Sequence, residues 1–388
     1  MKQIVIKKSE NNENLILLLE DGILVEKHLE NTKNKNIEGN IFIGKVQNVL
    51  PGLDSAFVNI GKNRNAFIAV KDILPKVDIV KQENNEENKE KINKLIKPGQ
   101  PLLVQVKKDT TTRKGVRVTT HLNIPGRFVV LCPNTPFVTV SQKIKEKERL
   151  KQLVLENLPS GVGAIVRTNA ENAKKEDIIF DIENLLKKWE ELKQVSIDDF
   201  PKQIYDSGGI IKKLINDVID SDLEEIIVED EELENQIKEI FKNLNKTVKL
   251  TVDKEDILYN YNLDRQLKDT ENRKIWLKSG GFITIDKTEA LTAIDVNSGK
   301  SIGKDDLEQT IFEVNYEATI EIAKQLRLRD IGGIIIIDYI DIHVKENKQK
   351  IIDLLKNEIK KDRSKVQIEG FTKLNLMELT RKHLYNNS

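Results

Sequence analysis

The segment from residue 290 to residue 341 constrains the fold most, because its pattern is that of a strand, a helix and a second strand joined by short connections. The apolar run 290-ALTAIDVNSG ends in a Ser-Gly turn, and apolar residues then recur at steps of three and four between residues 307 and 326, the period of an amphipathic helix. The run 334-IIIIDYID predicts a strand that is buried on both faces. A strand–helix–strand unit of this kind makes its two strands parallel.

Each of these two strands ends in an aspartate, Asp295 in the first and Asp338 in the second. Neighbouring strands lie about 5 Å apart, and open parallel sheets hold their ligands at the carboxyl edge of the strands. Two carboxylates at that distance repel each other, and a hard divalent cation such as Mg²⁺ removes the repulsion. The pattern therefore predicts a metal site, while a turn cap at Asp295 and an ion pair at Asp338 remain the alternative.

Composition limits the class of protein. The 388 residues suffice for roughly two to four compact units. The 63 basic and 63 acidic residues cancel, so net charge neither supports nor excludes a nucleic-acid partner. A single cysteine, Cys132, and four scattered histidines exclude a disulfide framework and disfavour a local zinc site. No signal-peptide core begins the chain and no apolar run could span a bilayer, so we expect a cytoplasmic protein.

Strand patterns dominate the first third of the chain. Residues 1–35 predict a hairpin, and residues 39–121 predict five short strands separated by turns such as Pro51-Gly52. The polar, low-complexity stretch 79–95 predicts a solvated loop between the third strand and the fourth. Five strands with this spacing suit a small barrel of the OB type.

Helical patterns follow. A unit from residue 127 to about residue 199 ends in an amphipathic helix at 173–192. Residues 205–275 predict helices near 208–219 and 231–244 and then a strand at 247–252, and residues 276–388 alternate strand and helix.

Three strings, 288-TEALTAIDVNSG, 324-KQLRLRDIGGIIIIDYID and 367-QIEGFTKLNLMELTRK, resemble the catalytic-domain pattern of the bacterial ribonuclease E/G endoribonucleases, and the resemblance extends from the first hairpin to the end of the chain. It implies a multi-domain α/β and α+β protein. An RNase H-like domain would be split between residues 1–38 and 200–275, with an S1-type OB barrel (39–121) and a 5′-sensor domain (122–199) inserted in it. A DNase I-like catalytic α/β domain (276–388) would follow.

The same resemblance implies a function for the carboxylate pair. Asp295 and Asp338 would hold the Mg²⁺ ion, which Mn²⁺ could replace, and Asn297 would orient the first aspartate. The expected activity is Mg²⁺-dependent endonucleolytic cleavage of single-stranded RNA that leaves 5′-phosphate and 3′-hydroxyl ends. Ribosomal and transfer RNA precursors and messenger RNA would be the substrates, in RNA maturation and messenger decay.

Two further groups of residues match RNA-contacting positions of the family. Phe57 and Phe67 with Lys108 and Lys114 would grip single-stranded RNA, although a phenylalanine in a barrel strand is more often part of the core. Arg167 and Thr168, with Gly126 and Val130, would line a pocket for a 5′-monophosphate. Without the resemblance, the Arg-Thr pair would be taken for an ordinary surface pair.

The chain also departs from the family pattern. Gln142 and Lys143 stand where a second arginine is common, and Lys365 replaces another arginine, so we expect a weaker preference for 5′-monophosphorylated ends. We expect the family's zinc linker and small oligomerisation domain to be absent, which would favour a monomer or homodimer over a tetramer. Two rivals remain: a non-catalytic RNA-binding or ribosome-assembly protein, which needs no carboxylate pair, and a metal-dependent phosphatase or DNA nuclease, which does not need the barrel.

Overall fold

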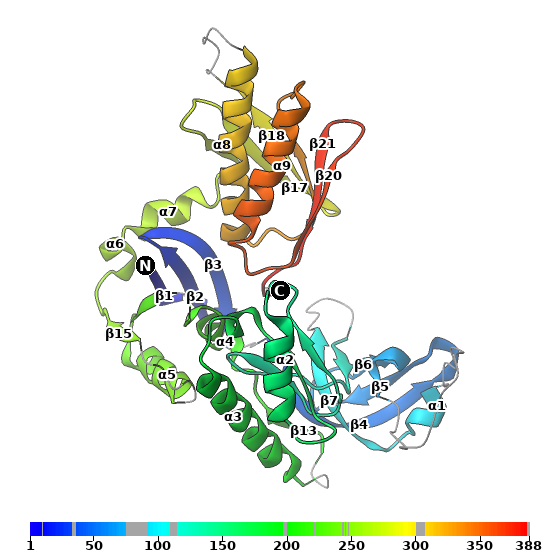
Figure 1. Cartoon of the computed structure of the whole chain (residues 1–388). Helices are drawn as coiled ribbons and strands as arrows, with labels where there is room; N and C mark the ends of the chain where they lie inside the picture. Colours follow the sequence, from blue (N-terminus) through cyan, green and yellow to red (C-terminus); the bar gives the residue numbers. More distant parts are fainter. Residues whose placement is uncertain are drawn as a thin grey trace. The chain divides into compact units, whose positions relative to one another are not determined.

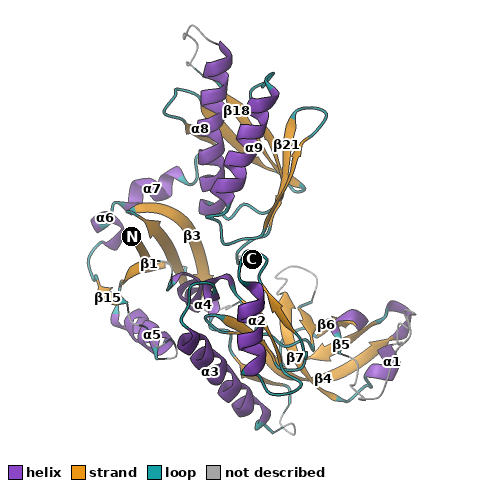
Figure 2. Ribbon diagram, viewed as in Figure 1, coloured by secondary structure: helices purple, strands orange, loops and turns teal. Residues whose placement is uncertain are grey.

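The computed structural model describes residues 1–9, 11–32, 36–74, 92–108, 115–196, 200–220, 222–242, 244, 246, 248–299 and 307–385. The chain forms two compact units, each built from separate segments. The first unit contains Met1–Glu30, Asp222–Glu234 and Val248–Asn387, and the second contains Asn31–Ser221 and Asn235–Thr247. Helices and strands are mixed throughout, as Figure 2 shows. Within the described residues, every helix is too short or too polar to cross a membrane.

One sheet of the first unit joins the start of the chain to its middle. Its order is β15-β14-β1-β2-β3, with β1 antiparallel to β2 and parallel to β14. The bounds are β1 (Lys2–Ser9), β2 (Glu13–Glu20), β3 (Ile23–Asn31), β14 (Leu223–Val228) and β15 (Lys249–Val252). The predicted hairpin at 1–35 is therefore incomplete, because the same residues also contain a third strand, β3. Two short helices, α6 (Ile257–Asn260) and α7 (Leu263–Asp269), pack Ile257 and Leu263 into the core of this sheet.

The second sheet of the first unit carries the predicted strand–helix–strand segment. Its order is β16-β17-β18-β19-β21-β20. The strands are β16 (Lys274–Trp276), β17 (Phe282–Lys287), β18 (Leu291–Asn297), β19 (Gly333–Asp338), β20 (Val366–Phe371) and β21 (Leu376–Arg381). Two helices, α8 (Leu307–Leu328) and α9 (Lys345–Ile359), lie along one face of the sheet (Figure 1) and share a hydrophobic core with it.

The opposite face of this sheet is open, which corrects one prediction. The run 334–337 was expected to be buried on both faces, yet Ile334 is 51% exposed, whereas Ile335 and Ile337 are fully buried. Successive strand residues point to opposite faces, and α8 and α9 cover only one of them. Four consecutive isoleucines thus line one buried face and one open face.

A buried ionic cluster connects β3 to the elements around the second sheet. Glu26 is fully buried on β3, and its carboxylate lies 2.5 Å from Arg363 Nη2, 3.5 Å from Arg327 Nη2 and 3.2 Å from His28 Nε2. Burial raises the pKa of the Glu26 carboxyl, but Arg363 and His28 outweigh burial and hold that pKa well below its usual range. Glu26 is therefore a buried, charged carboxylate held by cationic partners inside the first unit.

The second unit contains a closed five-stranded barrel, consistent with the predicted OB type. The strands follow the order β4-β5-β6-β8-β7, and pairing of β4 with β7 closes the ring. They are β4 (Ile41–Leu50), β5 (Ser55–Asn59), β6 (Ala66–Ala69), β7 (Pro101–Lys108) and β8 (Arg117–Thr119), and β13 (Lys202–Tyr205) pairs with β4 outside the ring. Short helical turns η1 (Pro51–Leu53), η2 (Val70–Asp72) and α1 (Ile92–Leu95) connect them. Most of the predicted polar loop at 79–95 lies outside the described residues.

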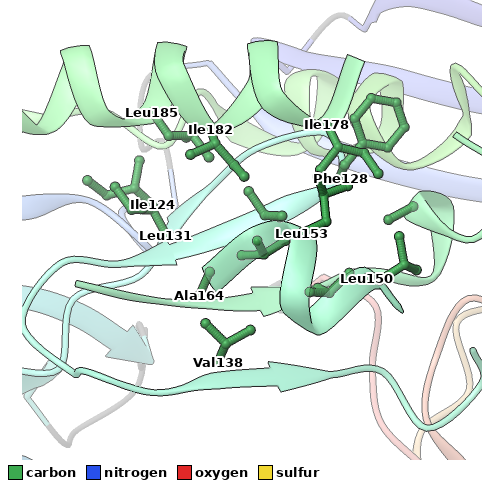
Figure 3. Close-up of a cluster of buried hydrophobic side chains, with 14 of the residues drawn as sticks. Ile124, Phe128, Leu131, Val138, Leu150, Leu153, Ala164, Ile178, Ile182 and Leu185 are labelled. Carbon is green, nitrogen blue, oxygen red and sulfur yellow. The ribbon is translucent and has the colours of Figure 1, made fainter. Parts of the chain in front are cut away.

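A four-stranded sheet, β11-β12-β10-β9, forms the rest of the second unit's core together with α2 and α3. Figure 3 shows Ile178, Ile182 and Leu185 of α3 above Leu131 and Ala164 of the strands. The elements are β9 (Ile124–Pro125), β10 (Val129–Cys132), β11 (Val138–Val140), β12 (Gly163–Val166), α2 (Lys147–Glu156), α3 (Lys175–Lys193) and a turn η3 (Thr168–Ala170).

The helix expected at 173–192 is α3, and those near 208–219 and 231–244 are α4 (Gly209–Val218) and α5 (Glu231–Phe241). The domain names RNase H-like, 5′-sensor and DNase I-like stay predictions.

Candidate active site

The two aspartates lie side by side at the carboxyl edge of the second sheet. Strands β18 and β19 are parallel neighbours, and Asp295 pairs in register with Asp338. Both side chains are exposed on the open face. The prediction that the strand–helix–strand segment forms two adjacent parallel strands is confirmed. β19 ends at Asp338, and β18 continues two residues past Asp295 to Asn297.

Asn297 contacts the first of these carboxylates. Its Nδ2 donates a hydrogen bond of 2.5 Å to Asp295 Oδ2, from two positions further along β18. Alternate residues of a strand share a face, so the amide and the carboxylate point the same way. The bond fixes the orientation of the Asp295 carboxylate.

Polar residues of α8 hold the end of β19, and sequence reasoning missed them. Asn315 is fully buried; its Nδ2 donates to Ile340 O at 2.8 Å, and its Oδ1 accepts from Ile340 N at 3.1 Å. Thr319 shares a 2.9 Å hydrogen bond with the hydroxyl of buried Tyr339. These bonds fix the backbone directly after Asp338. Their only sequence signal is a polar residue on the apolar side of an amphipathic helix.

The donor set suits Mg²⁺. Both carboxylates offer hard oxygen ligands, and Mg²⁺ characteristically takes one or two carboxylates and keeps several waters. Among the described residues, three or more His, Cys, Asp or Glu side chains nowhere gather in a cluster that could hold an ion.

On the barrel, Phe57 and Phe67 lie outside the core. They are paired across β5 and β6 with ring centroids 6.2 Å apart, both are half-buried, and neither belongs to the barrel's buried cluster. Their alternation with Ala56, Val58, Ala66 and Ile68, which are all fully buried, turns both rings outward. The register continues from Phe67 to Arg117 and from Arg117 to Lys108. Lys114 lies outside the described residues.

Arg117 is a basic residue in this row that sequence reasoning did not single out. Its Nη2 lies 2.6 Å from Asp72 Oδ2, and Lys107 Nζ lies 2.9 Å from Asp72 Oδ1. Burial raises the pKa of the Asp72 carboxyl, but the hydrogen bonds from Lys107 and Arg117 outweigh burial and lower that pKa. Asp72 is thus a buried anion that anchors two cations on the barrel surface.

Around Arg167, the structure brings three of the four predicted 5′-phosphate residues to neighbouring positions. Arg167 Nη1 donates to Gly126 O at 2.8 Å, and Arg167 Nη2 forms an ion pair with Asp217. Thr168 follows Arg167 and shares a 2.9 Å hydrogen bond with Ser141. The Arg167 side chain is one-quarter exposed, so the guanidinium is oriented by protein partners yet open to solvent.

Val130 lies on β10 opposite Pro125, the residue before Gly126. It pairs with Ile165 on β12 and lines a cavity of about 480 Å³ together with Gln105 and Asn123. Gln142, Lys143 and Lys365 are all exposed.

Gly126 occupies a position where no side chain fits. A Cβ there would lie 2.6 Å from Asp181 Oδ1. Asp181, on α3, accepts backbone hydrogen bonds from Arg127, Phe128 and Val129 at 3.0, 2.8 and 3.1 Å. Burial raises the pKa of Asp181 in spite of these bonds. The glycine therefore lets α3 approach the connection between β9 and β10, whose Gly126 carbonyl accepts a hydrogen bond from Arg167.

Several known proteins are similar to this chain over nearly its whole length. The sequence profile of the Ribonuclease E/G family matches residues 123–384. The chain is 36% identical over 380 residues to the Ribonuclease G of Salmonella typhimurium, covering 96% of this chain and 78% of that protein. It is 37% identical to the Ribonuclease G of Haemophilus influenzae, with 96% and 77% covered, and 36% identical to the Ribonuclease E of a Nostoc species, with 89% and 51% covered.

Proposed function

The chain belongs to the ribonuclease E/G family and is an endoribonuclease, and we propose that it cuts single-stranded RNA with the help of a Mg²⁺ ion bound by Asp295 and Asp338. The observation that carries this proposal is the pairing of the two aspartates in register on adjacent parallel strands. Among the described residues, the strand neighbours directly beside the pair are uncharged: Thr284 lies next to Asp295, and Leu376 lies next to Asp338.

Each residue of the site has a distinct task in phosphodiester hydrolysis. A bound Mg²⁺ ion would lower the pKa of a coordinated water and stabilise charge on the phosphate. Asp295 and Asp338 place that ion at the sheet edge, and Asn297 keeps the Asp295 carboxylate in a single orientation. Hydrolysis by water predicts products with 5′-phosphate and 3′-hydroxyl ends.

The second unit would supply RNA binding. Phe57 and Phe67 offer outward-facing rings on which unpaired bases can stack, with Lys108 in the same strand register for the phosphates. Arg167 and Thr168 would bind a terminal 5′-monophosphate, since a guanidinium and a hydroxyl both donate to phosphate oxygens. The protein would therefore distinguish RNA with a 5′-monophosphate from RNA without one.

Maturation of ribosomal and transfer RNA and decay of messenger RNA in the cytoplasm are the biological roles we propose. We also propose that the chain acts as a monomer or homodimer. These roles require endonucleolytic cleavage of RNA, and the names of the relatives, Ribonuclease G and Ribonuclease E, support such an activity.

The test is cleavage of a short 5′-monophosphorylated single-stranded RNA with Mg²⁺, using Asp295→Asn and Asp338→Asn beside Asp341→Asn. Asp341 is exposed just beyond β19, so its variant is a matched control for removing one negative charge. We expect both strand variants to lose turnover while retaining RNA binding, and the control to stay active. Cleavage without metal that leaves 2′,3′-cyclic phosphate, or turnover by the doubly substituted chain, would refute the mechanism. A wild-type chain that binds RNA without cutting it would favour the non-catalytic rival.

A further inference from the structure

A group of three side chains on the open face of the second sheet has no place in the cleavage chemistry. Trp276 on β16 is 60% exposed, and Phe282 on β17 is half-buried beside it. Their ring centroids are 5.2 Å apart with the planes at 62°. Lys274 Nζ lies 4.0 Å from the centroid of the Trp276 ring and 3.5 Å from that of Phe282. We call these three residues the aromatic platform.

Strand register places the platform beside the carboxylate pair. Trp276 pairs with Phe282, and Phe282 pairs with Asn297, the residue bonded to Asp295. In the next row, Lys274 pairs with Thr284, and Thr284 with Asp295. Residues that face each other across a sheet share a face, and each strand step covers about 4.8 Å. The platform therefore begins about 5 Å from Asn297, and Lys274 lies about 10 Å from Asp295.

The chemistry of the platform matches a nucleotide. Single exposed hydrophobic residues are common and prove nothing alone. Here, however, an ammonium group lies over two aromatic rings at a sheet edge that already bears two carboxylates. Nucleobases stack on aromatic faces, and lysine neutralises the phosphates that join them. An anionic substrate approaching two carboxylates needs such a cation close to the reacting phosphate.

We propose that the aromatic platform stacks a base of the RNA next to the bond that is cut, with Lys274 contacting an adjoining phosphate. This inference rests on the proposed function, because it assigns a task to residues beside the same carboxylates. The role is positioning: the stacked base fixes the phosphodiester over Asp295 and Asp338. The occupant we commit to is a nucleobase and not a second copy of the chain, since the basic Lys274 complements a phosphate backbone.

Kinetics give the first test. Stacking on an aromatic side chain contributes about 1–3 kcal/mol per base, so Trp276→Ala should lower kcat/KM by about tenfold, while Trp276→Tyr retains most of the rate. Tyr259→Ala is the matched control, because Tyr259 is a 73% exposed aromatic of the same unit on α6, outside this sheet. An RNA with one abasic nucleotide beside the cleavage site should abolish the difference between wild type and Trp276→Ala. A difference that persists with every abasic position overturns the proposal.

Fluorescence gives a second readout that does not depend on cleavage. The chain has two tryptophans, and Trp189→Phe leaves Trp276 as the only one. A short single-stranded RNA added in EDTA should quench this emission, and double-stranded RNA should not. If RNA leaves the emission unchanged while Mg²⁺-dependent cleavage proceeds, the platform is refuted and the proposed function stands. If emission depends on protein concentration and not on RNA, the face joins two chains and the proposal fails. Quenching without any cleavage would support the platform and refute the proposed mechanism.

Discussion

Replacing Asp338 with asparagine should have opposite effects on stability with and without Mg²⁺. The two carboxylates lie on adjacent strands about 5 Å apart, and both are exposed, so their repulsion in water is about 1 kcal/mol. Asparagine has nearly the same shape and no charge. In EDTA, Asp338→Asn should therefore stabilise the first unit by about 1 kcal/mol, which raises its melting temperature by about 2–4 °C for a unit of this size.

Adding Mg²⁺ should make wild type melt at a higher temperature than Asp338→Asn. A ligand that binds only the folded state, at a hundredfold above its dissociation constant, stabilises by about 2.7 kcal/mol. Wild type should gain about 5–10 °C, and the variant should gain little because half of its ligand set is gone. Differential scanning calorimetry in EDTA and in Mg²⁺ measures all four values. The reasoning is refuted if the variant melts below wild type in EDTA, or if Mg²⁺ stabilises both chains equally.

Three further outcomes follow from the contacts described. Glu26→Gln should lower the free energy of unfolding by about 3–5 kcal/mol, because it removes the charge of a buried carboxylate that pairs with Arg363 and faces Arg327. The folded-state pKa of Glu26 is depressed, so its stabilisation exists above the ordinary carboxyl pKa and fades as pH falls through the folded one. Urea titrations of wild type and variant should therefore converge in acid. Gly126→Ala should cost about 1–3 kcal/mol against Asp181, whereas Gly52→Ala, with nothing within 4 Å of its Cβ, should be neutral in the same titration. Arg167→Ala should slow cleavage of 5′-monophosphorylated RNA more than of 5′-hydroxyl RNA; equal slowing would remove the sensor role.

The carboxylate pair could be located from sequence because its signal is local. An apolar run, an amphipathic helix and a second apolar run within about fifty residues leave only a parallel pair of strands, and an aspartate lies at or near the end of each. The barrel strands were equally local, since turn residues such as Pro51-Gly52 separate them. What local patterns could not decide was the environment of each face. Ile334 and Ile335 are equally apolar. Ile335 is buried and Ile334 is exposed because helices cover only one face of the sheet.

Long-range pairing was invisible for a similar reason. The acidic stretch that begins at residue 221 hides β14, whose Ile226, Ile227 and Val228 are buried in the sheet between β1 and β15. Trp276 and Phe282 are six residues apart in sequence and look unrelated until the β16–β17 register opposes them. The sequence did not place Arg117 beside Phe67, because the two residues meet only through a single parallel pairing between β6 and β8.

The pairing of β1 with β14 has a consequence for synthesis on the ribosome. Gln3 can pair with Glu225 only after the ribosome has synthesised the residues between them. At ordinary elongation rates of 5–20 residues per second this takes about 10–45 seconds. In that time the nascent chain can fold its barrel and pair β13 with β4. This pairing brings Ile41 opposite Tyr205 and so shortens the loop that β1 and β14 still have to close. Until then the β1 edge is an open template for another polypeptide, and the lysines at positions 2, 7 and 8 are the kind of charge that discourages such pairing.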